Sequence, residues 1–514
     1  MKKITVSLLM LIVLLLTLSA CGGSRAAENG LTSEIIYGSG NYTAINPALY
    51  EHGEINTLLY AGLTAHDADN NVIPGLASSW TYDEATMTYT FKLREGLTFH
   101  DGKPLTCADI KFTIETIMNP ENGSENMSDF EEIESIDTTD DLTVIFRLKA
   151  TNVALPDYLS IGILPKHILD GQDVTISDYN RNPVGAGPYR LIDWDMGQSI
   201  VLEKFDKFYL GAPKIDRIIF KIIENYSVRA LQMKSGELTL AQVTPKDALS
   251  FRDNPGFVVY DMDTADYRGI LYNFGKKFWR DNPGLPAALS CGIDRDAIIR
   301  SILLGRGQPA WSPIQKGEYV NRNIEKYEYN PAKAQAAIED LGWTKGNDGY
   351  YTKEGERLEF TISARPSDTV RVSMAAIAAQ NLQDIGVNCT VDLAARTDWA
   401  GQFAFLIGWG SPFDPDYHTY KVFGTDKGAN YSRYSNHEVD RILTEARSEP
   451  MKSKRLKLYK EFQEVLASNP AYTFIAYIDA IYVAKPNLKG ITPRTTLGHH
   501  GVGIFWNVYE WTLE

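Results

Sequence analysis

The chain has 514 residues, of which 44% are hydrophobic and 23% are charged, and its formal net charge is −14. This length exceeds a single small core and fits about three domains or one large two-lobed body. The composition is that of an ordinary globular protein. The acidic balance argues against a nucleic-acid partner and against adhesion to anionic lipid.

Residues 1–21 have the pattern of an export signal. Lys2 and Lys3 precede an apolar run, 4–18, which is shorter than the about 20 residues of a membrane-spanning helix. Leu-Ser-Ala-Cys at 18–21 resembles a bacterial lipobox. The resemblance implies a signal peptide over 1–20 and a lipid on Cys21 that holds the protein on the extracytoplasmic face of the cell membrane. The alternative is an ordinary secretory signal that happens to end at a cysteine.

Beyond the signal, the chain contains Cys107, Cys291 and Cys389. They are far apart, odd in number and without Cys-x-x-Cys spacing, so they predict buried free thiols rather than a disulfide framework or a thiolate metal site.

The elements predicted along the chain are mixed. A first strand is expected over 34–37, and Asn46-Pro47 supplies the start of a helix over 48–59, although Gly53 weakens that pattern. Alternating or continuous apolar residues predict strands at 86–94, 142–148 and 218–223. Helical periodicity predicts helices at 108–118, 330–341, 370–382 and 452–466. Without a long repeat or a linker, this order predicts an α/β body.

A series of short motifs resembles the signature of one family. The motifs lie at 77–80, 89–94, 99–102, 104–106, 184–189, 293–295, 329–331 and 341–343. In order and spacing they resemble the large extracytoplasmic solute-binding proteins for peptides and nickel, family 5. The resemblance implies an α/β fold of the type II (cluster C) periplasmic-binding-protein kind, with two lobes, an extra small domain and two hinge crossings.

The same resemblance implies a division of the chain. Residues 21–31 would be a tether, and the hinge crossings would lie near Tyr272-Asn273 and 476–481. The first lobe would comprise 32–60, 187–272 and 480–514, the extra small domain 61–186, and the second lobe 273–479.

Family members feed an ATP-driven importer, and this chain has no Gly-x-x-x-x-Gly-Lys-Ser/Thr motif. The expected partners are therefore the permease and ATPase subunits of an ABC importer, and we expect a monomer. The chain also lacks Gly-x-Ser-x-Gly and His-Glu-x-x-His, so we expect a binding protein and not an enzyme. A secreted hydrolase is a distant alternative.

The turn from Gly408 to Asp416 bears on the ligand. Peptide-binding members place an Asp three residues after the Trp of this turn, where Pro412 stands here. The sequence is more similar to the turn of nickel-binding members, which implies that Trp409 and Phe413 line the pocket. Asp414 or Asp416 would remain available for the ammonium group of a peptide, so that alternative stays open.

Two adjacent histidines, His499 and His500, lie between Gly498 and Gly501. Adjacent residues reach one ion most readily from a flexible loop, which the glycines supply. The pair resembles the double-histidine prong of a nickel-binding branch, which implies His52 as a third ligand. Three neutral imidazoles suit nickel, cobalt, copper or zinc and leave positions for a chelator.

Arg365 ends a strand-like run, 360–364, directly before Pro366. It resembles the arginine that holds the chelator's carboxylate in the nickel branch. A structural salt bridge is the other interpretation of Arg365. The leading hypothesis is thus a lipid-anchored receptor for a nickel or cobalt chelate such as metal with histidine, and the alternative is a receptor for di- or oligopeptides.

Overall fold

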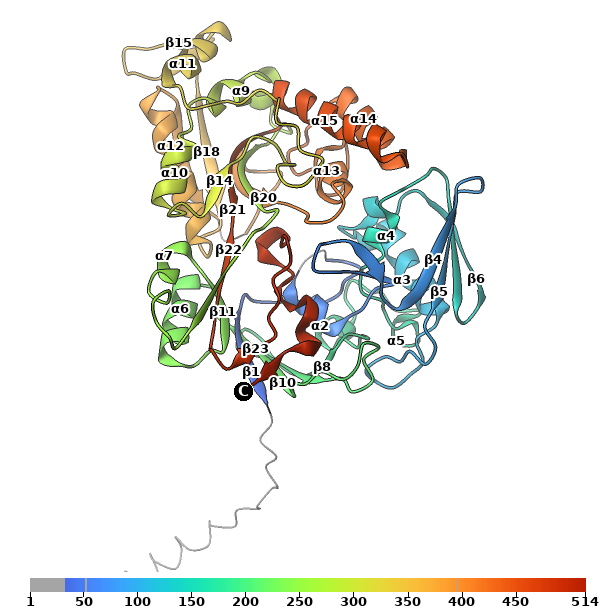
Figure 1. Ribbon diagram of the computed structural model, residues 1–514. Coiled ribbons are helices and arrows are strands. Elements are labelled where there is room, and N and C mark those ends of the chain that lie inside the picture. The colour runs from blue at the N-terminus through green and yellow to red at the C-terminus, as the bar shows by residue number, and fades with distance from the viewer. Residues whose placement is uncertain (1–32, 51–52, 395) are drawn as a thin grey trace, which may run out of the picture. The chain divides into compact units, whose positions relative to one another are not determined.

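The structure is a computed structural model that describes residues 33–50, 53–394 and 396–514 (Figure 1). The predicted signal peptide and tether lie outside the described residues. So do Cys21 and His52, two of the residues that the sequence singles out.

The first sheet is mixed and has seven strands. They are β1 (Glu34–Ser39), β8 (Tyr189–Asp195), β9 (Ser199–Lys204), β10 (Arg217–Ile222), β11 (Leu240–Val243), β12 (Val258–Met262) and β22 (Ala480–Ala484). Their order is β12-β22-β11-β1-β10-β9-β8. The central strand β1 pairs in parallel with β10 and β11, and all other neighbours are antiparallel.

The second sheet has six strands and is also mixed. They are β13 (Tyr267–Tyr272), β14 (Gly307–Pro309), β18 (Glu359–Ala364), β19 (Asn388–Leu393), β20 (Ala404–Trp409) and β21 (Tyr472–Ile478). Their order is β14-β21-β13-β20-β18-β19, with β18 parallel to both of its neighbours.

The third sheet is antiparallel, in the order β4-β5-β7-β6. Its strands are β4 (Ala77–Asp83), β5 (Thr88–Leu93), β6 (Ile133–Asp140) and β7 (Thr143–Leu148). Shorter strands form small sheets: β2 (Thr64–His66) with β3 (Val72–Pro74), β15 (Thr344–Lys345) with β16 (Tyr351–Lys353) and β17 (Glu356–Arg357), and β23 (Leu488–Lys489) with β24 (Thr512–Leu513).

Helices are interspersed among the strands along the chain (Figure 1). They are α2 (Glu54–Leu59), α3 (Cys107–Met118), α4 (Leu155–Tyr158), α5 (Lys166–Leu169), α6 (Tyr226–Ser235), α7 (Pro245–Ala248), α8 (Lys277–Asp281), α9 (Leu285–Ser290), α10 (Arg295–Ser301), α11 (Pro331–Asp340), α12 (Thr369–Asp384), α13 (Asp416–Phe423), α14 (His437–Ser448) and α15 (Lys452–Ser468). None of the helices in the described part of the chain has the length and apolar character needed to cross a membrane.

The long predicted helices are confirmed as α3, α11, α12 and α15, and the predicted strands as β1, β5, β7 and β10. The Asn330 side chain caps α11 by accepting a hydrogen bond from the Lys333 N–H at 2.9 Å. The helix predicted over 48–59 is wrong in extent, because α2 begins only at Glu54. Gly53 has a φ of 159°, which no helical residue adopts, so it stops a helix from running through.

The chain passes from the first sheet to the second between Met262 and Tyr267, and returns between Ile478 and Ala480. The return lies within the predicted crossing at 476–481. The first crossing comes before the predicted Tyr272-Asn273, because β13 pairs in the second sheet. The predicted boundary at 272 assigned β13 to the first lobe, whereas the partners of β13 lie in the second sheet.

We call 34–262 together with 480–514 lobe I, and 267–478 lobe II; the small domain is the part of lobe I over 61–186. One continuous apolar core joins the first sheet to the small domain. It contains Ile35 and Phe220 from the first sheet together with Phe91 and Phe146 from the third. Lobe II has its own apolar clusters. The first sheet and the small domain thus pack as one unit.

Cys107, Cys291 and Cys389 are free and buried, as predicted. Burial raises the pKa of the Cys389 thiol to about 12, so it stays protonated and unreactive at neutral pH.

Candidate functional site

His499 and His500 lie side by side in a short turn, His499–Gly501, with their ring centroids 3.9 Å apart. His500 has a φ of 59°, in the left-handed region that residues with a side chain rarely adopt. This backbone conformation lets two consecutive side chains reach the same place, which neither a strand nor a helix allows. The turn therefore presents a pair of adjacent imidazoles.

Asp266 holds both histidines from the crossing between β12 and β13. Its Oδ1 lies 2.9 Å from His499 Nδ1, and its Oδ2 accepts a hydrogen bond from the His500 backbone N–H at 2.9 Å. A carboxylate only accepts hydrogen bonds, so His499 Nδ1 carries a proton, and in the neutral ring the lone pair then lies on Nε2. Asp266 is fully buried and forms an ion pair with Arg268, which offsets the cost of burying its charge.

The His500 imidazole is held in its neutral form. Burial lowers its pKa well below the ordinary value, and the nearby His499, Arg371 and Arg268 lower it further. A neutral imidazole is the form that binds a metal ion.

A cavity of about 50 Å³ lies next to His500 between the two lobes. Tyr226 and Gln242 line it from lobe I, and Arg268 and Asp368 line it from lobe II. This volume has room for a few water-sized groups.

Glu54 connects the start of α2 to the histidine turn. Its Oε1 accepts a hydrogen bond from the Gly503 N–H at 3.1 Å and lies 3.3 Å from the Tyr482 hydroxyl. The same hydroxyl donates to the Gly501 carbonyl at 3.1 Å. Burial raises the pKa of Glu54 to about 7. The segment that follows His52 in the chain is thus tied to the loop that carries His499 and His500.

Aromatic side chains border the turn at the end of β20. Trp409 is buried, and its ring is stacked with the His499 ring at 5.7 Å between centroids. Phe413 stacks on His66 of lobe I with 3.6 Å between the ring centroids, and the Arg494 guanidinium lies 5.6 Å from the Phe413 ring centroid. Trp409 therefore lies at the histidine pair, and Phe413 packs on side chains of lobe I.

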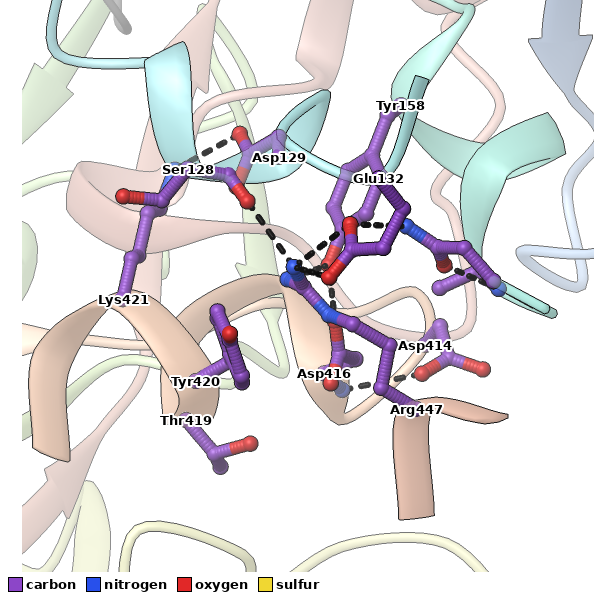
Figure 2. A network of polar contacts seen from close by, with 12 residues as sticks. Ser128, Asp129, Glu132, Tyr158, Asp414, Asp416, Thr419, Tyr420, Lys421 and Arg447 are labelled. Carbon is purple, nitrogen blue, oxygen red and sulfur yellow. Dashed lines mark hydrogen bonds and ion pairs between the residues drawn. The ribbon is translucent and has the colours of Figure 1, made fainter. Parts of the chain in front are cut away.

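Asp414 and Asp416 are each paired with an arginine of lobe II, and Figure 2 shows Arg447 beside Asp416. Arg455 forms a two-armed ion pair with Asp414, and Arg447 donates to Asp416 Oδ2 at 2.8 Å. Asp416 is fully buried. The structure thus uses both carboxylates to fix the turn that follows Trp409.

Arg365 lies directly after β18, as the sequence predicts, and its side chain is exposed. Its Nη2 and Nε donate to the Thr397 hydroxyl at 3.2 and 3.4 Å. A hydroxyl is a weaker partner for this fork than a carboxylate.

Among the residues that the structure describes, no three His, Cys, Asp or Glu side chains gather as a complete metal site. His52, the expected third ligand, is not among them. The structure brings His499, His500 and Trp409 together and leaves Arg365, Asp414 and Asp416 with partners of their own.

Sequence reasoning missed Asp266, Arg268 and Glu54. One signal for the first two was present: two charges, two residues apart, begin the apolar run that becomes β13. Charges in a buried strand need partners or a function. Glu54 lies two residues after His52, within the helix predicted over 48–59, and nothing in that pattern marked it as part of the site.

The comparisons with known proteins agree on one family. The family model described as "Bacterial extracellular solute-binding proteins, family 5 Middle" matches residues 71–431. The oligopeptide-binding protein AppA of Bacillus subtilis is 28% identical, covering 100% of both chains.

Two solved structures are similar to this chain over most of its length. NikZ from Campylobacter jejuni, in complex with Ni(L-His), is 35% identical, with a TM-score of 0.89 over 93% of this chain and 99% of that chain. AppA from Bacillus subtilis, in complex with a nonapeptide, is 26% identical, with a TM-score of 0.87 over 94% of this chain and 99% of that chain.

The expected type II periplasmic-binding-protein fold is confirmed, and the hydrolase alternative is excluded because members of this family are transport receptors and not enzymes. The chain belongs to the family 5 bacterial extracellular solute-binding proteins, the receptors that capture peptides or nickel chelates for ABC importers.

Proposed function

We propose that this receptor captures a nickel or cobalt chelate, such as the metal with free histidine, and delivers it to an ABC permease by closure of its lobes. The observation that carries the proposal is the pair of imidazoles held by Asp266. A carboxylate that orients a histidine through Nδ1 is the usual support of a metal-binding Nε2.

The metal would bind to His499, His500 and His52. Imidazole nitrogens suit nickel and cobalt, and three of them leave positions for a small chelator. The contact of Glu54 with Gly503 supports a place for His52 beside the pair, since Glu54 follows it by two residues. The similarity to NikZ, whose structure contains Ni(L-His), supports the same cargo.

The chelator would bind through its carboxylate to Arg365 and would pack against Trp409. Among the described residues the Arg365 guanidinium donates only to the Thr397 hydroxyl, and a carboxylate would be a better partner for it. Phe413, stacked on His66, would close the pocket wall between the lobes.

The peptide alternative has less support from the site. Pro412 occupies the position of the carboxylate that would hold a peptide's ammonium group. Asp414 and Asp416, the remaining carboxylates of this turn, are held by Arg455 and Arg447. The similarity to AppA, solved with a nonapeptide, keeps peptides as the second candidate.

Isothermal titration separates the two candidates. The protein is titrated with Ni²⁺ and L-histidine, with Co²⁺ and L-histidine, with Ni²⁺ alone and with a nonapeptide. We expect binding of the metal with histidine, and at least a 100-fold loss in a variant with both His499→Ala and His500→Ala. His437→Ala, an exposed histidine at the start of α14, is the matched control. Unchanged nickel-histidine affinity in the double variant would refute the proposal.

We also propose that a lipid on Cys21 holds the receptor, as a monomer, on the extracytoplasmic face of the cell membrane. The lipobox-like sequence at 18–21 supports this. Cys21→Ser is expected to move the protein from the membrane fraction to the soluble fraction of cells; a variant that stays in the membrane fraction would count against the anchor.

A further inference from the structure

The small domain and lobe II meet mainly through charged side chains, with two aromatic contacts beside them, Phe413 on His66 and Tyr417 against Tyr158. Their apolar cores are separate, and Tyr417 is the lobe II residue among those described that packs against the core of lobe I. Figure 2 shows the contact, with residues of η2 (Met127–Asp129) and of the segment after it facing α13 and α14.

Arg447 of α14 is the centre of this contact. Its Nη1 donates to the Ser128 carbonyl at 2.8 Å and to both carboxylate oxygens of Glu132 at 3.1 Å. Its Nε donates to Asp416 of its own lobe, and the Tyr158 hydroxyl from the small domain donates to the same Asp416. The Arg447 side chain is 1% exposed, so these partners replace its water.

Two lysines of lobe II add further ion pairs. Lys421 lies 3.3 Å from Asp129, with the side chains 0% and 3% exposed, and Lys427 lies 2.6 Å from Glu131. The Tyr420 hydroxyl also donates to Glu131. Three cations of lobe II thus face three carboxylates of the small domain.

The composition of this contact makes it separable. Parting two apolar surfaces exposes them to water at a cost proportional to their area. Parting buried ion pairs returns the charges to water, and that solvation offsets much of the lost attraction. The interaction is therefore specific in geometry and modest in net free energy, as a contact that forms and breaks in each cycle requires.

We propose that these residues form a closure clasp: Lys421, Lys427 and Arg447 of lobe II engage Asp129, Glu131 and Glu132 of the small domain when the lobes close on the ligand, and release them when the lobes part. The small domain shares its core with the first sheet, so it moves with lobe I. Any opening at the crossings separates it from lobe II.

The clasp also reaches the candidate ligand site. Asp416, which binds Arg447 and Tyr158, begins α13 directly after the turn that carries Phe413. Arg455 fixes that turn through Asp414. The Tyr158 hydroxyl of the small domain donates to the same Asp416, so the closed clasp holds this turn in place.

The test measures closure directly in a soluble form with Cys21→Ser. Spin labels are attached to Glu84→Cys, in the exposed β4–β5 turn, and to Asp340→Cys, at the exposed end of α11; Cys107, Cys291 and Cys389 are buried. The distance distribution is recorded by pulsed electron paramagnetic resonance without ligand and with Ni²⁺ and L-histidine. The tested variant carries Glu131→Gln and Glu132→Gln, amides of similar shape that remove two of the three facing charges.

We expect the clasp variant to populate the longer, open distance more than the parent protein does without ligand, and to bind the chelate on the order of tenfold more weakly. The matched control carries Glu438→Gln and Glu445→Gln, which remove two partners of Arg441 within lobe II. It should change neither the ligand-free distance distribution nor the affinity for the chelate. Lys421→Met is a second variant with the same expectation as the clasp variant.

Identical ligand-free distance distributions in the parent and in both folded clasp variants, verified by circular dichroism, would overturn the clasp. So would an equal shift in the Arg441 control. The ligand-free comparison does not depend on the identity of the cargo, so failure to bind nickel with histidine would refute the proposed function and leave the clasp to be judged by the distances.

Discussion

At the scale of single residues, Asp266 is the side chain on which the histidine pair depends. It fixes the His499 proton on Nδ1 and holds the His500 backbone in its left-handed conformation. Neither role is visible locally in the sequence, because the partners lie 233 residues apart.

We expect Asp266→Asn to weaken binding of nickel with histidine by about 10- to 100-fold. The amide keeps one acceptor oxygen and replaces the other with a donor, so it cannot accept from both His499 Nδ1 and the His500 N–H, and the pair loses its orientation. Titration calorimetry measures the effect. Asp261→Asn, which removes an ion-pair partner of Arg252 at the end of β12, is the control and should bind like the parent protein. Equal affinity in Asp266→Asn would show that the carboxylate does not position the pair.

His100 belongs to the Phe-His-Asp-Gly motif and has a structural role. Its Nδ1 accepts a hydrogen bond from the Gly185 N–H at 3.1 Å, and its Nε2 lies 3.1 Å from the Gly187 carbonyl. Two motifs that are separate in the sequence thus bind each other. The sequence identified both motifs and not their contact.

Burial lowers the pKa of His100 to about 4, from an ordinary value of 6.5. The folded protein favours the neutral His100 ring. The contribution of His100 to the free energy of unfolding is therefore complete above pH 6.5 and is lost as the pH falls towards 4. The difference between these two pKa values corresponds to about 3 kcal/mol of unfolding free energy. We expect His100→Gln to lower stability at pH 7.5 and to flatten its decline between pH 6.5 and 4, as measured by urea unfolding. His437→Gln, at an exposed position, should keep the parent's slope; the same slope in His100→Gln would contradict the assignment.

At the scale of elements, the sequence was most informative where an element carries its own signals. Asn330 and Asp368 cap α11 and α12 through side-chain hydrogen bonds, and these helices lie where they were expected. Local signals of this kind did not predict where α2 begins or to which sheet β13 belongs. A short helix depends on what packs against it, and a strand's sheet is decided by partners far away in the chain.

The turn after β20 is held by the Arg455–Asp414 pair, in which both side chains are largely buried. Burial raises the pKa of Asp414, so its ionised form relies on Arg455. We expect Asp414→Asn to lower the free energy of unfolding by about 3 kcal/mol, because it leaves Arg455 buried and unpaired. Chemical denaturation checks this. Asp281→Asn breaks an exposed pair in α8 and should change stability by less than about 0.5 kcal/mol. Equal stability losses in the two variants would mean that the buried pair is no more important than a surface one.

At the scale of the whole molecule, family motifs spread over the chain predicted the fold, because each motif marks a turn or a contact that the architecture needs. They did not predict which face of the small domain meets lobe II. That contact joins η2 to α13 and α14, and it is built from charges that look like ordinary surface residues in the sequence. Charge pairing across distant segments is visible only once the fold brings them together.

The central claim is that a metal chelate binds between the lobes at the histidine turn. Diffraction from crystals grown with Ni²⁺ and L-histidine, recorded at the nickel absorption edge, locates the metal directly. The account predicts one nickel ion about 2.1 Å from nitrogens of His52, His499 and His500, with the histidine carboxylate on Arg365. A nickel ion elsewhere on the protein, or a peptide and no metal between the lobes, would contradict it.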